Sequence, residues 1–259
     1  MAGEKLNDAV EFAKNPEPRC PCILLLDTSQ SMQGDRIQAL NAGLHTFRTE
    51  VVRDTLAAHR VDVAIVTFDS EVRVVQDFVS MIDFKPPSLT ASGQTRLAGG
   101  IERALDLMDA RKEQYRKWGI FYYRPWVFMI TDGKSEGESD EAVAQAARRV
   151  HLYEEAKHVA FFAVGMEGAD IRRLAQIVVR TPLELEGLQF REMFQWLSGS
   201  MQAASTSQPG EKVVLAQPGW IKRIALYVTE NEQELTKVAH AIGKVGGALL
   251  KGAVGWPQH

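Results

Sequence analysis

The chain has 259 residues, of which 45% are hydrophobic and 24% are charged, and its formal net charge is −3. This apolar fraction excludes a chain that is disordered throughout, and the length predicts between one and two domains. The small negative charge argues against a protein that coats nucleic acid, because such proteins are basic.

The cysteine content, with no secretory signal and no membrane span in the sequence, predicts a cytoplasmic location. The first 19 residues are polar and lack the apolar core of a secretory signal. No apolar run is long enough for an ordinary membrane span. Cys20 and Cys22 are one residue apart, which fits neither a zinc motif nor a redox motif. We expect Cys22 to pack in a strand, Cys20 is a candidate for exposure, and a reducing compartment is the default.

Short apolar runs that stop at polar turns predict strands buried on both faces, and apolar residues spaced three and four apart predict helices. In chain order, the predicted elements are a strand at 22–27, a helix at 34–56, strands at 61–68 and 72–78, a helix at 97–108, a strand at 126–131, a helix at 140–150, a strand at 159–164, a helix at 171–177, a short strand at 183–185 and a helix at 190–198.

The order of these elements predicts the fold. The gap between the strands at 61–68 and 72–78 is too short for a helical crossover, so the second of them is expected to be an antiparallel edge strand. Elsewhere strands alternate with helices, which predicts a three-layer α/β/α sandwich with a mostly parallel sheet. We divide the chain into an N-terminal arm (1–18), an α/β domain (19–200), a linker (201–212) and a C-terminal extension (213–259).

The C-terminal extension predicts an amphipathic helix over residues 230–251. Its apolar residues recur at helical spacing, and Lys237, Lys244 and Lys251 recur every seven residues on another face. Three glycines weaken the helix by about 1 kcal/mol each relative to alanine. We favour docking of this helix on protein over a role at a membrane surface, because one short, glycine-bearing helix binds lipid weakly.

Polar side chains gather where three loops reach the carboxyl edge of the predicted sheet. These loops are residues 27–31, 93–95 and 131–133. They carry the carboxylates of Asp27 and Asp132 and the hydroxyls of Ser29, Ser31 and Thr95. Oxygen donors without thiolate or imidazole suit Mg²⁺ or Mn²⁺ better than zinc. In the competing interpretation the first loop only caps the next helix, but it does not explain why three such loops coincide.

The DxSxS pattern at residues 27–31, the distant Thr95 and Thr131-Asp132-Gly133 resemble the metal-ion-dependent adhesion site of von Willebrand factor A domains. The resemblance covers residues 19–200. Within this superfamily the chain is most similar to a bacterial branch associated with tellurium resistance. The segments that carry this second similarity are residues 25–29, 67–70, 84–87 and 194–198.

The resemblance implies direct ligation of the ion by Ser29, Ser31 and Thr95, with Asp27 and Asp132 acting through water or as outer acceptors. The implied ion is Mg²⁺, with Mn²⁺ and Ca²⁺ as alternatives. Neutral ligands leave most of its charge uncancelled, so a Glu or Asp from a partner protein can complete the coordination. The implied function is a non-catalytic interaction module in bacterial stress response or in kinase and phosphatase signalling. The rim that meets the partner is expected to include Gln30, Asp69, Gln94 and Gly133.

A metal-dependent hydrolase of phosphoesters that uses the same loops is the main alternative. It lacks a positioned base, a nucleophile and a second set of metal ligands. Gly133-Lys134-Ser135 looks like the end of a phosphate-binding loop, but Phe128 stands where that motif requires glycine. An aspartyl phosphatase would need a second Asp where Ser29 stands.

Aromatic residues alternate with Lys and Arg between residues 115 and 126, a composition that would suit stacking on single-stranded nucleic acid. We prefer a partly packed loop between a helix and a strand, because the chain as a whole is acidic. Some of these aromatics are candidates for contacts with another protein.

Overall fold

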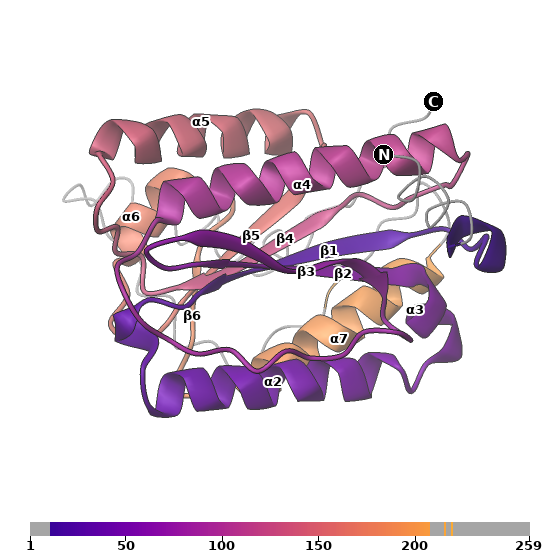
Figure 1. Cartoon of the computed structure of the whole chain (residues 1–259), viewed down its shortest axis with the longest axis horizontal. Helices are drawn as coiled ribbons and strands as arrows, with labels where there is room; N and C mark the ends of the chain where they lie inside the picture. Colours follow the sequence, from indigo (N-terminus) through magenta and orange to yellow (C-terminus); the bar gives the residue numbers. More distant parts are fainter. Residues whose placement is uncertain (1–10, 208–214, 216–218, 220–259) are drawn as a thin grey trace, which may run out of the picture.

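A six-stranded sheet forms the middle layer of the protein (Figure 1). The structure is a computed structural model, and the residues it describes are 11–207, 215 and 219. The strands are β1 (Cys20–Asp27), β2 (Val61–Phe68), β3 (Val72–Ser80), β4 (Trp126–Thr131), β5 (Ala160–Gly165) and β6 (Leu183–Glu184). Their order is β3-β2-β1-β4-β5-β6, and only the β2–β3 pair is antiparallel.

Helices cover both faces of the sheet (Figure 1). The helices on one face are α2 (Asp35–Val51), α3 (Thr55–Arg60) and α7 (Phe190–Thr206). The helices on the other face are α4 (Leu97–Lys117), α5 (Asp140–Glu155) and α6 (Ile171–Ile177). The predicted three-layer sandwich with one antiparallel edge strand is therefore confirmed. None of the described helices is both long and apolar enough to cross a membrane.

Side chains of strand β1 pack into both hydrophobic cores, one on each face of the sheet. Cys22, Leu24 and Leu26 pack into the core under α2 and α7. Ile23 and Leu25 pack into the core under α4 and α5. Successive side chains of a strand point to opposite faces, so a strand covered on both sides must be apolar at every position. This double burial is why the continuous apolar run predicted the strand.

The predicted helix over residues 34–56 was wrong in one respect, because it is two helices. Helix α2 ends at Val51, and α3 begins after Asp54. The Asp54 carboxylate accepts hydrogen bonds from the backbone amides of Leu56 (2.9 Å) and Ala57 (3.0 Å). This N-cap satisfies free amides and starts a new helix, so the apolar spacing continues while the helix axis does not.

Helix α4 runs to Lys117, nine residues beyond the predicted end at Met108. Tyr115 therefore belongs to the helix and is fully buried. Trp126 opens β4 and is also buried, whereas Trp118 and Phe121 remain 37% and 47% exposed. The predicted loop is shorter than expected, and most of its aromatic side chains contribute to packing.

Helix α7 runs to Thr206 instead of the predicted end at Ser198. Small residues in its second half resemble a linker in composition, but Met201 and Ala204 pack into the core beside α2 and stabilise further turns. Leu215 is also buried in that core. The rest of the predicted linker and the predicted C-terminal amphipathic helix lie outside the described residues, so the domain division stays a prediction.

Cys20 is fully buried, which corrects the expectation that it is a candidate for exposure. Strand β1 begins two residues earlier than predicted, at Cys20 itself, and pairs there with Val61 of β2. Burial raises the pKa of Cys22 to about 12 and that of Cys20 further still. Burial therefore disfavours the thiolate, which is the nucleophilic form, at both positions.

A buried ionic cluster lies at the amino end of the sheet. The Asp62 carboxylate is 2.8 Å from Arg111 Nη2, 2.6 Å from Tyr115 Oη and 3.5 Å from Arg19 Nε. Both Arg19 and Asp62 have no exposed side-chain area. Arg111 also pairs with Glu11, a residue of the predicted N-terminal arm. The last residues of that arm are therefore packed against the domain.

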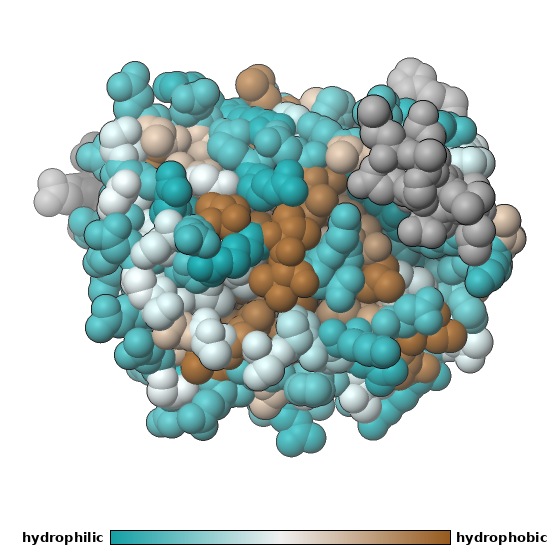
Figure 2. All heavy atoms as spheres, in the orientation of Figure 1, coloured by the Kyte–Doolittle hydropathy of each residue, from teal (hydrophilic) through white to brown (hydrophobic). Residues whose placement is uncertain are grey.

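The edge strand β3 lies on the face seen in Figure 2, where apolar side chains gather over the middle of an otherwise hydrophilic surface. Val75 on this strand is 41% exposed. The exposed charged residues Arg73 and Asp77 lie two positions before and after Val75, on the same face of the strand. The β2–β3 register also shifts near Ile65. Charges and register irregularities are features by which edge strands avoid pairing with other chains.

The contact between α2 and α7 depends on Gly43. A Cβ atom at this position would lie 2.4 Å from Cδ2 of Phe194. We expect Gly43→Ala to lower the free energy of unfolding by about 1–3 kcal/mol, because it overpacks the core. Urea denaturation followed by circular dichroism measures the change. Gly199→Ala on α7 is the matched control: no atom lies near its Cβ, and it should raise stability by about 0.5–1 kcal/mol. Equal changes in both variants would contradict the packing argument.

Candidate metal centre

The three predicted loops lie at one edge of the sheet. Asp27 is the last residue of β1 and is in register with Phe68, the last residue of β2. On the other side, Leu26 is in register with Ile130 of β4, one residue before the end of that strand. Parallel strands in register end together, so the segments that follow them are brought side by side.

Asp27 lies at the bottom of this edge and is fully buried. One carboxylate oxygen accepts a hydrogen bond from the Ser29 amide (2.9 Å), and the other accepts one from the Thr131 hydroxyl (2.7 Å). Burial raises the pKa of Asp27 to about 6, although these hydrogen bonds oppose the rise, and the nearby Asp132 carboxylate adds to it. A cation next to this group would favour its charged form.

Ser29 and Ser31 place two hydroxyl groups beside each other. Their Oγ atoms are 3.0 Å apart. Ser29 is buried and precedes the short 3₁₀ helix η1 (Gln30–Met32), on which Ser31 lies half-buried. The Asp27 side chain accepts a hydrogen bond from the backbone amide of Ser29, two residues later in the chain. This turn fixes the direction in which the loop leaves β1.

Thr95 is buried and held from two sides. The loop that carries it is tied to the first loop, because Gln30 N donates to Gly93 O (3.0 Å). Its own carbonyl accepts a hydrogen bond from Glu136 N (3.0 Å), in the loop that follows β4. Thr95 is therefore positioned between the other two loops, as the predicted site requires. Gln94, beside it, is exposed.

Gly93 lets the second loop approach β2 closely. Its φ is +79°, and a Cβ there would lie 2.4 Å from Ser70 Oγ. That same hydroxyl accepts a hydrogen bond from Gln94 N (2.9 Å). A left-handed backbone and this contact both favour glycine.

Asp132 follows β4 and is buried. One of its carboxylate oxygens accepts a hydrogen bond from Lys134 N (3.0 Å), and the other lies 3.8 Å from Lys134 Nζ. Gly133 has a φ of +76°, and its amide donates to Thr131 Oγ1 (3.1 Å). A Cβ at Gly133 would lie 2.9 Å from Asp170 O, so the tight turn after Asp132 needs glycine.

Asp69 lies at the same edge of the sheet, but its carboxylate already accepts hydrogen bonds from neighbouring residues. Its carboxylate accepts hydrogen bonds from Thr28 Oγ1 (3.0 Å), Glu71 N (2.9 Å) and Arg73 Nη1 (2.8 Å). Asp69 is buried, and these contacts leave its carboxylate engaged away from an ion; its place at a rim that meets a partner stays a prediction.

Sequence reasoning missed Glu138. Its two carboxylate oxygens accept hydrogen bonds from Ala98 N (2.8 Å) and Gly99 N (2.9 Å), the free amides at the start of α4. Glu138 thereby ties the loop after β4 to the helix that follows Thr95. The partners are about 40 residues apart in the chain, so no local spacing could have indicated the contact.

The donor set suits a hard divalent cation. Its members are the side-chain oxygens of Asp27, Ser29, Ser31, Thr95 and Asp132. Within the described residues, no group of three or more His, Cys, Asp and Glu side chains is arranged to hold a metal ion. That finding does not bear on this site, because three of its five donors are hydroxyls. Hydroxyl and carboxylate oxygens are the ligands that hard divalent cations prefer.

Comparison with known proteins identifies the domain. The sequence model of the von Willebrand factor type A domain matches residues 22–185, which include all five donors of the site. The chain belongs to this family. Von Willebrand factor type A domains are generally non-catalytic modules that mediate protein–protein interactions. A search among curated proteins found no match.

Solved structures of von Willebrand factor type A domains and adhesins share the fold. A von Willebrand factor type A protein from Catenulispora acidiphila is 20% identical, with a TM-score of 0.54 over 72% of this chain and 43% of its own. The pilus adhesin SpaC from Lactobacillus rhamnosus GG is 12% identical, with a TM-score of 0.57 over 71% of this chain and 30% of its own. The proximal thread matrix protein 1 of the mussel byssus is 18% identical, with a TM-score of 0.50 over 72% and 48%.

These similarities concern the fold. The chain spans less than half the length of each of the three structures, and no identity exceeds 20%. The adhesive or structural roles that their names describe therefore belong to those proteins.

Proposed function

We propose that this von Willebrand factor type A domain is a Mg²⁺-dependent protein-interaction module. A Glu or Asp side chain of a partner completes the coordination of the ion. The observation that carries the proposal is the pair of hydroxyl oxygens of Ser29 and Ser31, 3.0 Å apart, next to the buried carboxylate of Asp27.

The chemistry of the donors explains why a partner carboxylate would bind. Ser29, Ser31 and Thr95 are neutral ligands and leave most of the +2 charge of the ion in place. Asp27 and Asp132 act through water or as outer acceptors of hydrogen bonds. Mg²⁺ prefers six oxygen ligands and keeps several waters, one of which an outside carboxylate can replace. Such a contact is a salt bridge through a metal, and the loop surfaces around it set its specificity.

The rim around the ion supplies those surfaces. Gln30 and Gln94 are exposed on either side of the site, and Gly133 leaves the third loop without a side chain at its turn. Mg²⁺ is the ion that this site would hold in the cell. Mn²⁺ or Ca²⁺ can replace it in experiments, although Ca²⁺ prefers six to eight ligands at longer distances.

The proposed biological setting rests on the segments 25–29, 67–70, 84–87 and 194–198, which resemble the tellurium-resistance branch of the family. In that setting the protein works in the bacterial cytoplasm in a stress response. Its partners are then components of protein kinase or phosphatase signalling.

The two alternative functions, a phosphoesterase and a membrane-surface adaptor, have less support. A phosphoesterase would need a base, a nucleophile and further metal ligands around the same ion. Around Asp27 the described hydrogen bonds come instead from the Ser29 amide and the Thr131 hydroxyl. An adaptor that binds a membrane surface through residues 230–251 would depend on a segment outside the described residues.

Affinity capture with and without EDTA tests the interaction. We expect the wild-type protein to retain partners in 5 mM Mg²⁺, a concentration chosen as roughly saturating for a weak site, and to lose them in EDTA. Asp27→Asn should lose the same partners at both conditions, whereas Asp54→Asn, at the N-cap of α3 and outside the site, should retain them in Mg²⁺. Partners that bind equally well in EDTA would contradict recognition through the metal. Turnover of p-nitrophenyl phosphate by the wild type, lost in Asp27→Asn, would favour the hydrolase.

A further inference from the structure

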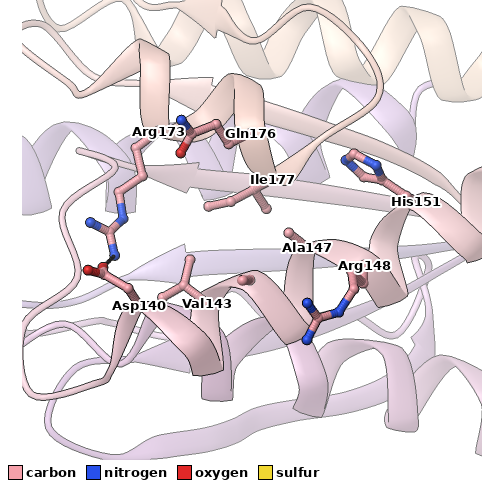
Figure 3. A pocket seen from close by; sticks show the side chains of 9 residues that line it. Asp140, Val143, Ala147, Arg148, His151, Arg173, Gln176 and Ile177 are labelled. Atoms are coloured by element: carbon pink, nitrogen blue, oxygen red, sulfur yellow. Dashed lines mark hydrogen bonds and ion pairs between the residues drawn. The ribbon is translucent and has the colours of Figure 1, made fainter.

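A cavity lies between α5 and α6, away from the candidate metal donors (Figure 3). Its volume is about 490 Å³, within the range of roughly 300–1,000 Å³ that small-molecule sites occupy. None of the candidate metal donors lines it. The side chains that line it are Asp140, Val143, Ala144, Ala147, Arg148, His151, Arg173, Gln176 and Ile177.

The cavity has an apolar floor and a polar rim. Val143, Ala147 and Ile177 form the floor and are buried. Two guanidinium groups, those of Arg148 and Arg173, stand at the rim on different helices (Figure 3). A site with a continuous apolar surface and a few convergent polar groups is the usual form of a ligand pocket.

Two nitrogen atoms of the lining residues have no hydrogen-bond partner. They are Nε2 of His151 and Nε of Arg173, and both are buried. Buried polar atoms are nearly always paired, so each unpaired one requires an explanation. Neither atom is open to solvent in this structure, so a ligand in the cavity reaches them only if the imidazole ring or the guanidinium group rotates. A bound acceptor would satisfy them.

The charges of the rim select an anion. Asp140 pairs with Arg173 at 3.0 Å and offsets one of the two positive charges. Arg148 is exposed and forms no ion pair with another described residue, so its charge remains for a ligand. Guanidinium groups bind planar carboxylates through paired hydrogen bonds.

We propose that this cavity binds a small carboxylate that carries an apolar group. The carboxylate contacts Arg148 and the rotated Arg173 and His151, and the apolar group covers Val143, Ala147 and Ile177. The proposal does not depend on the metal centre, because it uses no residue of that site.

The cavity nevertheless adjoins the loops of the metal centre. Helix α6 begins at its cap Asp170, whose amide donates to Asp132 O (2.9 Å) and whose side chain accepts from Arg173 N (3.0 Å). Helix α5 follows directly from the loop that carries Asp132 and Glu138. A ligand that moves Arg173 therefore acts next to the backbone that positions Asp132.

Titration of the isotope-labelled full chain with benzoate, followed by NMR of its methyl groups, tests the proposal. We expect saturable shifts of the Ile177 and Val143 methyl signals, with a dissociation constant of about 1 mM for so small a probe. Benzamide has the same shape without the charge, and acetate has the charge without the ring. Each should bind at least about tenfold more weakly, since each lacks one of the two contacts.

Two variants and one control variant localise the binding. Arg148→Ala removes an exposed side chain and should weaken benzoate binding about tenfold without loss of folding, whereas Arg191→Ala, on α7, should leave it unchanged. Ala144→Trp fills the cavity from an exposed helix position and should abolish the shifts. Equal binding of benzoate and benzamide, an unchanged affinity in Arg148→Ala, or no saturable shift at Ile177 would overturn the proposal. None of these results depends on Mg²⁺, so failure here is distinguishable from failure of the metal site.

Discussion

Asp27→Asn is expected to abolish the stabilisation of the protein by Mg²⁺. Binding of an ion to the folded state alone stabilises it by about 2.7 kcal/mol at a concentration one hundred times the dissociation constant. For a domain of this size that corresponds to a rise in melting temperature of about 5–10 °C. Differential scanning fluorimetry with and without Mg²⁺ measures the rise, which the wild type should show and Asp27→Asn should not.

The reason is the position of the Asp27 carboxylate. It is buried beneath Ser29 and Ser31 and is the most enclosed negative charge of the site. Asparagine keeps the volume and can still accept the hydrogen bond from Ser29 N, but it does not supply the charge that offsets a divalent ion.

Asp69→Asn is the matched control for that result. Asp69 is also a buried acid at the carboxyl end of a strand, but its carboxylate is taken up by Thr28, Glu71 and Arg73. Its variant should melt at a lower temperature and still respond to Mg²⁺. A full Mg²⁺ response in Asp27→Asn, or its loss in both variants, would contradict the assignment.

Asp62→Asn is expected to lower the free energy of unfolding by about 3–5 kcal/mol, the range found when one partner of a buried ion pair is removed. Asp62 neutralises Arg19 and Arg111 at a place where neither Arg19 nor Asp62 has exposed area. Urea denaturation measures the change. The loss should be large because the fully buried Arg19 loses the Asp62 carboxylate, although Arg111 keeps its ion pair with Glu11.

A double variant separates this effect from a general loss of packing. Asp62→Asn combined with Arg111→Met removes a carboxylate and one of the cations that it neutralises. We expect the combined loss of stability to be smaller than the sum of the two single losses by at least about 1 kcal/mol, since contacting charges couple. Additive losses, or a loss below about 1 kcal/mol for Asp62→Asn alone, would show that the cluster does not act as a buried ionic unit.

The sequence predicted the sheet well for a physical reason. Strands such as β1 and β4 are covered on both faces, so their apolar runs are continuous and end where the chain reaches a polar edge. The same ends carry Asp27 and Asp132, which is why the candidate metal loops could be located from their place after predicted strands.

Helix ends were harder to predict, because they depend on contacts that are distant in the chain. The Asp54 cap divides the predicted helix at 34–56, whereas α7 continues past Ser198 because Met201 and Ala204 pack into the core beside α2. Tertiary packing overrides the propensity of individual residues in such cases.

The supporting contacts of the site could not be predicted either. Glu138 holds the start of α4 across about 40 residues, and Asp62 meets Arg111 across 49. A motif such as DxSxS reports residue types along one loop. It says nothing of the partners that fix that loop in space, and these follow only from the fold.

Diffraction from crystals grown with MnCl₂ tests the central claim most directly, because Mn²⁺ replaces Mg²⁺ and gives an anomalous signal. We predict one strong anomalous peak within about 2.0–2.3 Å of the Ser29 and Ser31 Oγ atoms, a distance typical of Mn²⁺ and Mg²⁺ bound by oxygen. The peak should disappear in crystals of Asp27→Asn. A map without a peak at these hydroxyls, or with the peak unchanged in the variant, would contradict a metal centre at this edge of the sheet.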